Sequence, residues 1–217
     1  MGERRIEAAL RQATDTQNVN IAAGASVPDV FLEGVSECSA VAIAALYKLI
    51  LERELGDLDI EALCDSWPTR EEMERSVRAQ HTSPDLERGA VEQTLAKYIN
   101  AGELAQRLQL LRDVWPGLRE EVRVQLMPAE QISEMLQAAG CPTGPVEIGL
   151  RWEDFEATYL RARTIRKRYT VLDLAFEAGI LEECVDELFA PDGFWGRAAA
   201  SHARADEAGS FRRSDEA

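Results

Sequence analysis

The strongest constraint on the fold is a series of apolar stripes with helical spacing. Within residues 42–50, 104–114 and 118–126, apolar side chains recur at intervals of three and four. Gly56 follows the first stripe as a stop signal, and Pro116 separates the other two. Nothing in residues 38–190 alternates with a period of two for long enough to indicate a strand. The sequence therefore predicts an all-α fold, a compact multi-helix bundle with flexible termini.

Helix start and stop signals divide this bundle. Thr69 with Glu72 forms a capping box in the sequence TREE, and Ser83 followed by Pro84 is a second helix start. Pro128 opens a helix that Gly140 stops, and residues 141–150 hold too many prolines and glycines to be helical. We expect a long amphipathic helix over residues 152–168, then a helix capped by Thr170 and separated from the next by Gly179.

Composition divides the chain into three parts. Residues 12–30 have neither helical nor strand period, so we predict a poorly ordered leader over residues 1–30. The helical domain spans residues 31–196. Residues 197–217 consist almost entirely of Ala, Ser, Arg, Asp and Glu, which predicts a disordered tail.

Charge and cysteine usage bound the function. A formal net charge of −15 disfavours nucleic acid and anionic membranes as partners. The apolar run 41–51 contains Lys48 and is about half the roughly 20 residues that span a bilayer, and the N-terminus has no secretory pattern. The four cysteines are scattered without zinc-ligand spacing. We expect a cytoplasmic protein with four reduced thiols.

Positive charge is concentrated in residues 161–168. As a helix, this segment places Arg163, Arg166 and Lys167 on one face, with Arg161 and Arg168 at the sides. Such a face could bind a phosphate. Cations in the last turn of a helix also offset its dipole, and they can pair with carboxylates such as Glu153. The pattern favours the helix end and leaves a phosphate contact open.

Other candidate residues do not form a complete catalytic site. His81 precedes a proline cap and is interpreted as a surface or capping residue, since the only other histidine lies in the tail. The acidic pairs are typical of solvated helix faces. They are Glu71 with Glu72 and Glu182 with Glu183. The sequence contains no Walker loop, no G-x-S-x-G, no H-E-x-x-H and no G-x-G-x-x-G after a strand. From the residues alone, no catalytic residue is assigned.

Two segments resemble a known family. The run MPAEQISEMLQAAGCPTGPVEIGL followed by RARTIRKRYTVLDLAFEAGIL is similar to the carboxy-terminal helical domain of sn-glycerol-1-phosphate dehydrogenases, within the iron-containing alcohol dehydrogenase superfamily. The similarity covers roughly residues 31–196. The matching positions are Gly140, Pro142, Thr143, Glu147, Gly149, Ile165, Arg166, Arg168, Tyr169, Thr170, Val171 and Leu172.

The resemblance implies an enzyme of two domains. An α/β domain binds NAD(P), and the helical domain supplies ligands to a divalent metal that polarises the carbonyl of dihydroxyacetone phosphate during hydride transfer. Arg166 and Arg168 match positions that the family keeps beside its cleft, so the resemblance makes them candidates for a substrate-phosphate contact. Glu33 with Gly34 stands where the family has a metal-binding histidine before glycine.

The sequence departs from the family plan in its metal and nucleotide motifs. It lacks the glycine-rich fingerprint and the other metal motifs, and a lone Glu33 carboxylate does not make a site of several ligands. We therefore expect no cofactor on this chain alone, and predict the helical half of such an enzyme, truncated and incomplete by itself. It would pair with a nucleotide-binding domain or subunit, or form a homo-oligomer. The alternative is a non-enzymatic helical scaffold that binds a partner protein through an exposed apolar surface.

Overall fold

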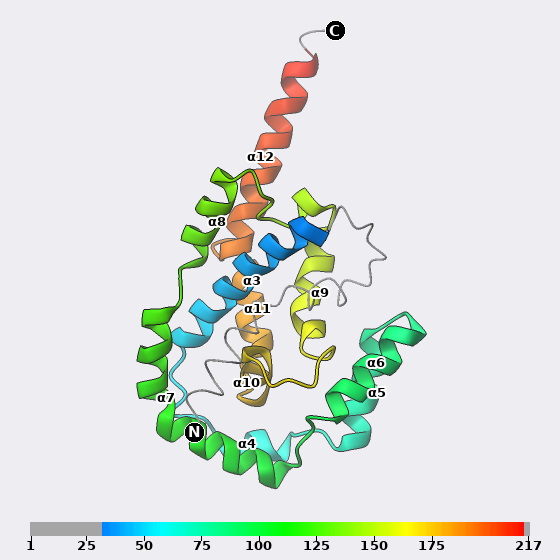
Figure 1. The fold of residues 1–217 in the computed structure, drawn as a ribbon, viewed down its shortest axis with the longest axis vertical. Helices are drawn as coiled ribbons and strands as arrows, with labels where there is room; N and C mark the ends of the chain where they lie inside the picture. The colour runs from blue at the N-terminus through cyan, green and yellow to red at the C-terminus, as the bar shows by residue number, and fades with distance from the viewer. Residues whose placement is uncertain (1–31, 215–217) are drawn as a thin grey trace.

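Regular structure in the described part of the chain is entirely helical, which confirms the predicted fold class. The computed structural model describes residues 32–214, with side chains over residues 38–204 (Figure 1). The predicted leader lies outside the described residues. The elements in chain order are α3 Leu32–Glu52, α4 Ile60–Asp65, α5 Arg70–Gln80, α6 Pro84–Leu95, α7 Ala101–Gln125, α8 Ala129–Ala138, the short 3₁₀ helix η2 Val146–Ile148, α9 Trp152–Ala162, α10 Val171–Glu177, α11 Leu181–Phe189 and α12 Phe194–Ser214.

The body of the molecule is built around α3, which packs against α8 and α11, while α11 also packs against α9 and α12. Phe155 is fully buried and makes edge-to-face contacts with the rings of Tyr159, Phe189 and Trp195. The polar atoms of this aromatic cluster are paired: Trp195 Nε1 donates to Tyr159 Oη at 2.7 Å, and Tyr159 Oη donates to the backbone oxygen of Ala42 at 3.1 Å. The cluster therefore fixes α9 and α12 against α3 without an orphaned buried group.

Helix α7 continues through Pro116, so the predicted break at that residue is wrong. Proline removes a backbone donor and disfavours the helix interior. Here both sides of it are anchored: Trp115 is buried and its Nε1 donates to the backbone oxygen of Arg53 at 2.9 Å, and Val122 is buried one turn beyond Leu118. Tertiary packing thus overrides the local signal. The helix curves along one side and the base of the molecule in Figure 1.

Helices α5 and α6 form a hairpin that stands beside the body (Figure 1). The predicted capping box is confirmed: Thr69 Oγ1 accepts from the backbone N–H of Glu72, whose carboxylate accepts from the backbone N–H of Thr69. α6 begins at Pro84, as predicted. The hairpin has its own small apolar cluster, separate from the main core. Its members are Val77, Ala90 and Val91, with Leu95 packed against them.

Helix α9 ends at Ala162, so the predicted helix over residues 152–168 is too long and its shared cationic face is wrong. After it, residues 163–170 form an irregular segment, called here the α9–α10 loop. The backbone oxygen of Arg163 accepts from Lys97 Nζ at 2.6 Å, and that of Thr164 accepts from Thr94 Oγ1 at 3.3 Å. Side chains of the α6 region therefore take carbonyl oxygens that helical continuation would use.

Two predicted glycine stops are confirmed. Gly140 ends α8 with φ of 76°, and Gly179 separates α10 from α11 with φ of 71°. Both lie in the left-handed region that favours glycine. A side chain at Gly179 would also collide with Leu63, because a Cβ there would stand 2.7 Å from Leu63 Cδ2.

Residues 197–214 are helical as part of α12, where the sequence predicts a disordered tail. This helix projects beyond the body in Figure 1. Four alanines within residues 198–203 explain the helical geometry, because alanine has the highest intrinsic helix propensity.

All four cysteines are free thiols, as predicted. Cys38 and Cys184 are buried, and burial raises the pKa of Cys38 to about 12, with a smaller contribution from the negative charge of Glu147. Within residues 32–214, no helix is both long enough and apolar enough to cross a bilayer.

Candidate functional site

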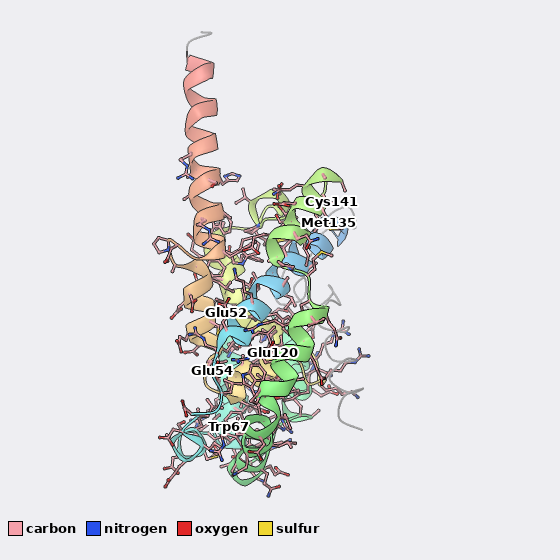
Figure 2. The ribbon with its side chains drawn as sticks, turned by 90° about the vertical axis from the view of Figure 1, so that its left-hand side faces the viewer. Glu52, Glu54, Trp67, Glu120, Met135 and Cys141 are labelled. Carbon is pink, nitrogen blue, oxygen red and sulfur yellow. The ribbon has the colours of Figure 1, made fainter. Side chains whose placement is uncertain are left out.

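Five charged side chains from four parts of the chain lie close together beside the α9–α10 loop. They are Lys97 after α6, Arg107 on α7, Arg163 after α9, and Asp173 and Glu177 on α10. These five residues are called here the ionic cluster. Four of them, all except Arg107, line a small cavity between the hairpin and the body, whose wall also includes Trp67. Figure 2 shows Trp67 near the end of the molecule opposite the free end of α12.

Asp173 is fixed by the start of α10. Its Oδ2 accepts from the backbone N–H and the hydroxyl of Thr170, at 2.8 and 3.0 Å, which is the capping predicted for Thr170. Its Oδ1 pairs with Lys97 Nζ at 2.5 Å. Both side chains are nearly buried, with exposed fractions of 12% for Lys97 and 7% for Asp173. This ion pair therefore joins the end of α6 to α10 in a place largely shielded from water.

Glu177 is the second carboxylate of the ionic cluster. Arg107 Nη1 lies 2.6 Å from its Oε1, and Tyr169 Oη donates to its Oε2 at 2.9 Å. The guanidinium of Arg107 also lies over the Tyr169 ring, 4.9 Å from its centroid. Burial raises the pKa of Glu177, and the charge of Arg107 and the Tyr169 hydroxyl act against that rise.

Arg163 is buried without a carboxylate partner in the part of the chain that the structure describes. Its guanidinium carbon lies 3.6 Å from the centroid of the Phe176 ring, and its Nη2 is 3.8 Å from Met73 Sδ. The pKa of Arg163 is lowered by burial, the largest influence, against the opposing charges of Asp173 and Glu177. Its cation is therefore held mainly by an aromatic face.

A polar connection, called here the hairpin latch, ties α5 and α6 to the α9–α10 loop. His81 Nε2 lies 2.9 Å from Thr164 Oγ1, and Gln93 Oε1 accepts from the backbone N–H of Lys167 at 3.1 Å. The contacts of Thr94 and Lys97 to loop carbonyls complete it. His81 is buried rather than on the surface, which corrects the surface interpretation, although it does occupy the C-cap position of α5.

The two arginines predicted to contact phosphate lie in the same loop, outside the cavity wall. Arg166 is half-buried and already engaged in an interaction, and Arg168 is exposed. The cation of this loop that lines the cavity is instead Arg163. Glu33 falls in the first turn of α3, and its side chain lies outside the described ones. No group of three or more potential metal-binding side chains occurs among the described residues.

Other residues of the family-like motif have clear structural contacts. Glu147 accepts from the backbone N–H groups of Thr143 and Gly144, at 2.7 and 2.8 Å. Gly149 adopts φ of 74° after η2, and Leu150 closes the turn through the backbone oxygen of Pro145. The motif therefore specifies the shape of the turn before α9.

Sequence reasoning missed most of the ionic cluster. Lys97 in the turn after α6 and Arg107 in α7 stand in polar stretches without a distinguishing pattern. Asp173 could have been found, since it follows Thr170 by three residues, the spacing of a capping box. Glu177, one turn after Asp173, lies on the same face of α10. The buried cations of this arrangement can bind a group that accepts hydrogen bonds. Its two carboxylates already accept hydrogen bonds from neighbouring residues.

Comparison with known proteins gives no assignment. No protein-family model matches the chain, and neither the curated proteins nor the solved structures contain a significant match.

Proposed function

We propose that this chain is the helical, metal- and substrate-side part of an sn-glycerol-1-phosphate dehydrogenase-like oxidoreductase, with the architecture of the carboxy-terminal domain of iron-containing alcohol dehydrogenases. In this proposal it acts in the cytoplasm and interconverts dihydroxyacetone phosphate and glycerol 1-phosphate. It does so only together with a nucleotide-binding domain or subunit that supplies NAD(P). The chain alone is not catalytically complete.

The observation that carries this proposal is the fit between the motif and the turns it occupies. Gly140 and Gly149 need positive φ, Glu147 closes the turn between them, and Thr170 caps the following helix. The motif residues on which the resemblance is based are thus residues that form turns and a helix cap in this helical fold. Arg166 and Arg168 lie in the adjacent loop as the proposed phosphate contacts, with Arg168 exposed and Arg166 already engaged in an interaction.

Mixing with a nucleotide-binding half tests this proposal. The purified chain is combined with the nucleotide-binding portion of a glycerol-1-phosphate dehydrogenase, a divalent metal, NADH and dihydroxyacetone phosphate. We expect NADH oxidation only in the mixture, with a raised KM for the phosphate substrate in Arg168→Ala. Arg75→Ala, an exposed arginine on α5, is the matched control. A mixture that forms a complex yet stays inactive contradicts the proposal, and so does saturable NADH binding by the chain alone.

A scaffold function is the second candidate, and one observation favours it. Leu110, Val114 and Val124 are exposed on α7, and their spacing places them on one face. Met135 on α8 is also exposed, on the side that Figure 2 turns toward the viewer together with Glu120 of α7. This α7 stripe suits an apolar helix face, of another protein or of a second copy.

The double variant Leu110→Lys and Val124→Lys tests the scaffold function. If a second copy is the partner, sedimentation shows an oligomer for the parent chain and a monomer for the variant. The matched control is Arg112→Ala with Glu121→Ala on the same helix. A monomeric parent excludes self-association, and an unchanged oligomer in the variant excludes this face.

A further inference from the structure

The cavity inside the ionic cluster has room for one small guest. Its volume, counted as the space open to the centre of a water molecule, is about 20 Å³. A single water needs roughly 10–15 Å³ by this measure. The wall includes Trp67, Thr94, Lys97, Arg163, Phe176 and Glu177. A phosphate ester of a three-carbon substrate exceeds this space, so the cavity is distinct from the proposed substrate contact at Arg166 and Arg168.

Each carboxylate oxygen of the ionic cluster already accepts at least one hydrogen bond. Asp173 receives Lys97 on one oxygen, and the backbone N–H and hydroxyl of Thr170 on the other. Glu177 receives Arg107 on one oxygen and the hydroxyl of Tyr169 on the other. A guest that must donate hydrogen bonds, such as a metal-bound water or an ammonium group, therefore finds no carboxylate oxygen that lacks a donor.

The neutral donors in the wall are occupied as well. Trp67 Nε1 donates to the backbone oxygen of Ile99 at 2.8 Å, and Tyr98 Oη donates to that of Pro68 at 3.0 Å. Thr94 Oγ1 donates to the backbone oxygen of Thr164. These side chains close the cavity without contributing a free polar atom to it.

The spare hydrogen-bonding capacity belongs to cations. A guanidinium has five N–H donors, and the one contact of Arg163 to a hydrogen-bond acceptor among the described residues is the weak one to Met73 Sδ. Lys97 uses two of its three N–H groups, on Asp173 and on the backbone oxygen of Arg163. Arg163 is only 6% exposed, so water from the bulk cannot fully solvate these donors.

The charges of the ionic cluster do not balance. Lys97, Arg107 and Arg163 face Asp173 and Glu177, an excess of one positive charge within the cluster, although Arg107 lies outside the cavity wall and the exposed Glu182 adds a negative charge that acts on Arg163. A buried charge is costly unless a counter-charge accompanies it. The excess lies at Arg163, because the other two cations have carboxylate partners.

We propose that the ionic cluster binds one small monovalent anion of the chloride type, held by the guanidinium of Arg163 and the remaining N–H of Lys97. The anion supplies the acceptor and the counter-charge that Arg163 lacks among the described residues. Because Lys97 and Arg163 also belong to the connection between α6 and α10, the bound anion stabilises the attachment of the hairpin.

Thermal unfolding of the full chain tests whether the bound anion stabilises the protein in solution. Sodium chloride is compared with sodium gluconate at equal ionic strength, since gluconate is too large for the cavity. Above the Kd, each tenfold rise in chloride is expected to raise Tm by about 3–5 °C relative to gluconate. Arg163→Met abolishes this difference. Arg75→Met, which removes the same charge from an exposed position on α5, preserves it. An equal response in Arg163→Met overturns the proposal.

Bromide in crystals of the unaltered chain locates the site and does not depend on a variant that folds. The proposal expects an anomalous peak beside the Arg163 guanidinium. A peak elsewhere, or a non-anomalous water in the cavity at saturating bromide, overturns it. A peak in the cavity without a chloride effect on Tm means an adventitious ion only and overturns it too.

Discussion

The α3–α9–α11 body and the α5–α6 hairpin are held in different ways. The body surrounds a large apolar core in which Phe155, Leu46 and Ile50 are almost completely buried. The hairpin has only a small apolar cluster of its own, and it is joined to the α9–α10 loop by hydrogen bonds of His81, Gln93, Thr94 and Lys97 and by the weak contact of Arg163 to Met73 Sδ. Apolar burial is not directional, whereas hydrogen bonds and ion pairs require fixed geometry. We infer that the body determines whether the chain folds and the latch determines where the hairpin sits.

Truncating the body should have the largest effect. Phe155→Ala removes a ring at the centre of the aromatic cluster and should lower the free energy of unfolding by about 3–5 kcal/mol. Val77→Ala removes fewer atoms from the hairpin cluster and should cost about 1–2 kcal/mol. Urea unfolding followed by circular dichroism measures both. Equal losses would mean that the hairpin cluster is as important as the main core.

Breaking the buried ion pair comes next. Lys97→Met leaves Asp173 without its cation and should cost about 3 kcal/mol, because a buried charge loses its partner. Asp173→Asn tests the other side of the pair. The double variant should lose less than the sum of the two, with a coupling energy of about 1–3 kcal/mol. Strict additivity in urea unfolding would contradict the pairing.

Removing the α5 cap should have a smaller effect. Thr69→Ala deletes the hydroxyl that accepts from the backbone N–H of Glu72, and should cost about 1 kcal/mol. Thr69→Ser keeps the hydroxyl and serves as the control. The loss should appear mainly as faster hydrogen exchange in α5. If the loss were spread evenly over α3 and α9, the hairpin would not be the separate unit inferred here.

The smallest effect concerns pH. Burial lowers the pKa of His81; the charge of Arg161 also lowers it, and Glu87 opposes them. His81 therefore binds a proton more readily in the unfolded chain than in the folded one. Its contribution to the free energy of unfolding is fully present above the pKa that it has in the unfolded chain. It is lost as pH falls from about 7.5 towards 5.5. Tm should decline over this range and decline less in His81→Gln. An identical slope in the variant would remove His81 as the cause.

Local signals predicted much of the fold and little of the site. The capping box at Thr69, the proline start at Pro84 and the glycine stops at Gly140 and Gly179 depend on neighbouring residues, so the sequence shows them directly. The fold class followed from the apolar spacing. Where distant residues intervene, local reasoning failed, as it did at Pro116, whose helix continues because Trp115 is anchored to the α3 region.

The ionic cluster illustrates the same limit. Arg163 was recognised as part of a cationic run, but its burial against Phe176 depends on where α9 stops. That stop depends in turn on Lys97 and Thr94, which lie more than sixty residues away in the chain. No short-range pattern marks such residues. Only the capping role of Asp173 had a readable signal.

Hydrogen exchange of the full chain, compared between the parent and Lys97→Met, tests the difference between body and hairpin most directly. In the parent, amides of α5 and α6 should exchange faster than those of α3 and α11. In Lys97→Met, protection in α5 and α6 should fall by at least tenfold relative to the change in α3. Uniform protection in the parent, or a uniform fall in the variant, would contradict the account and show a single cooperative unit.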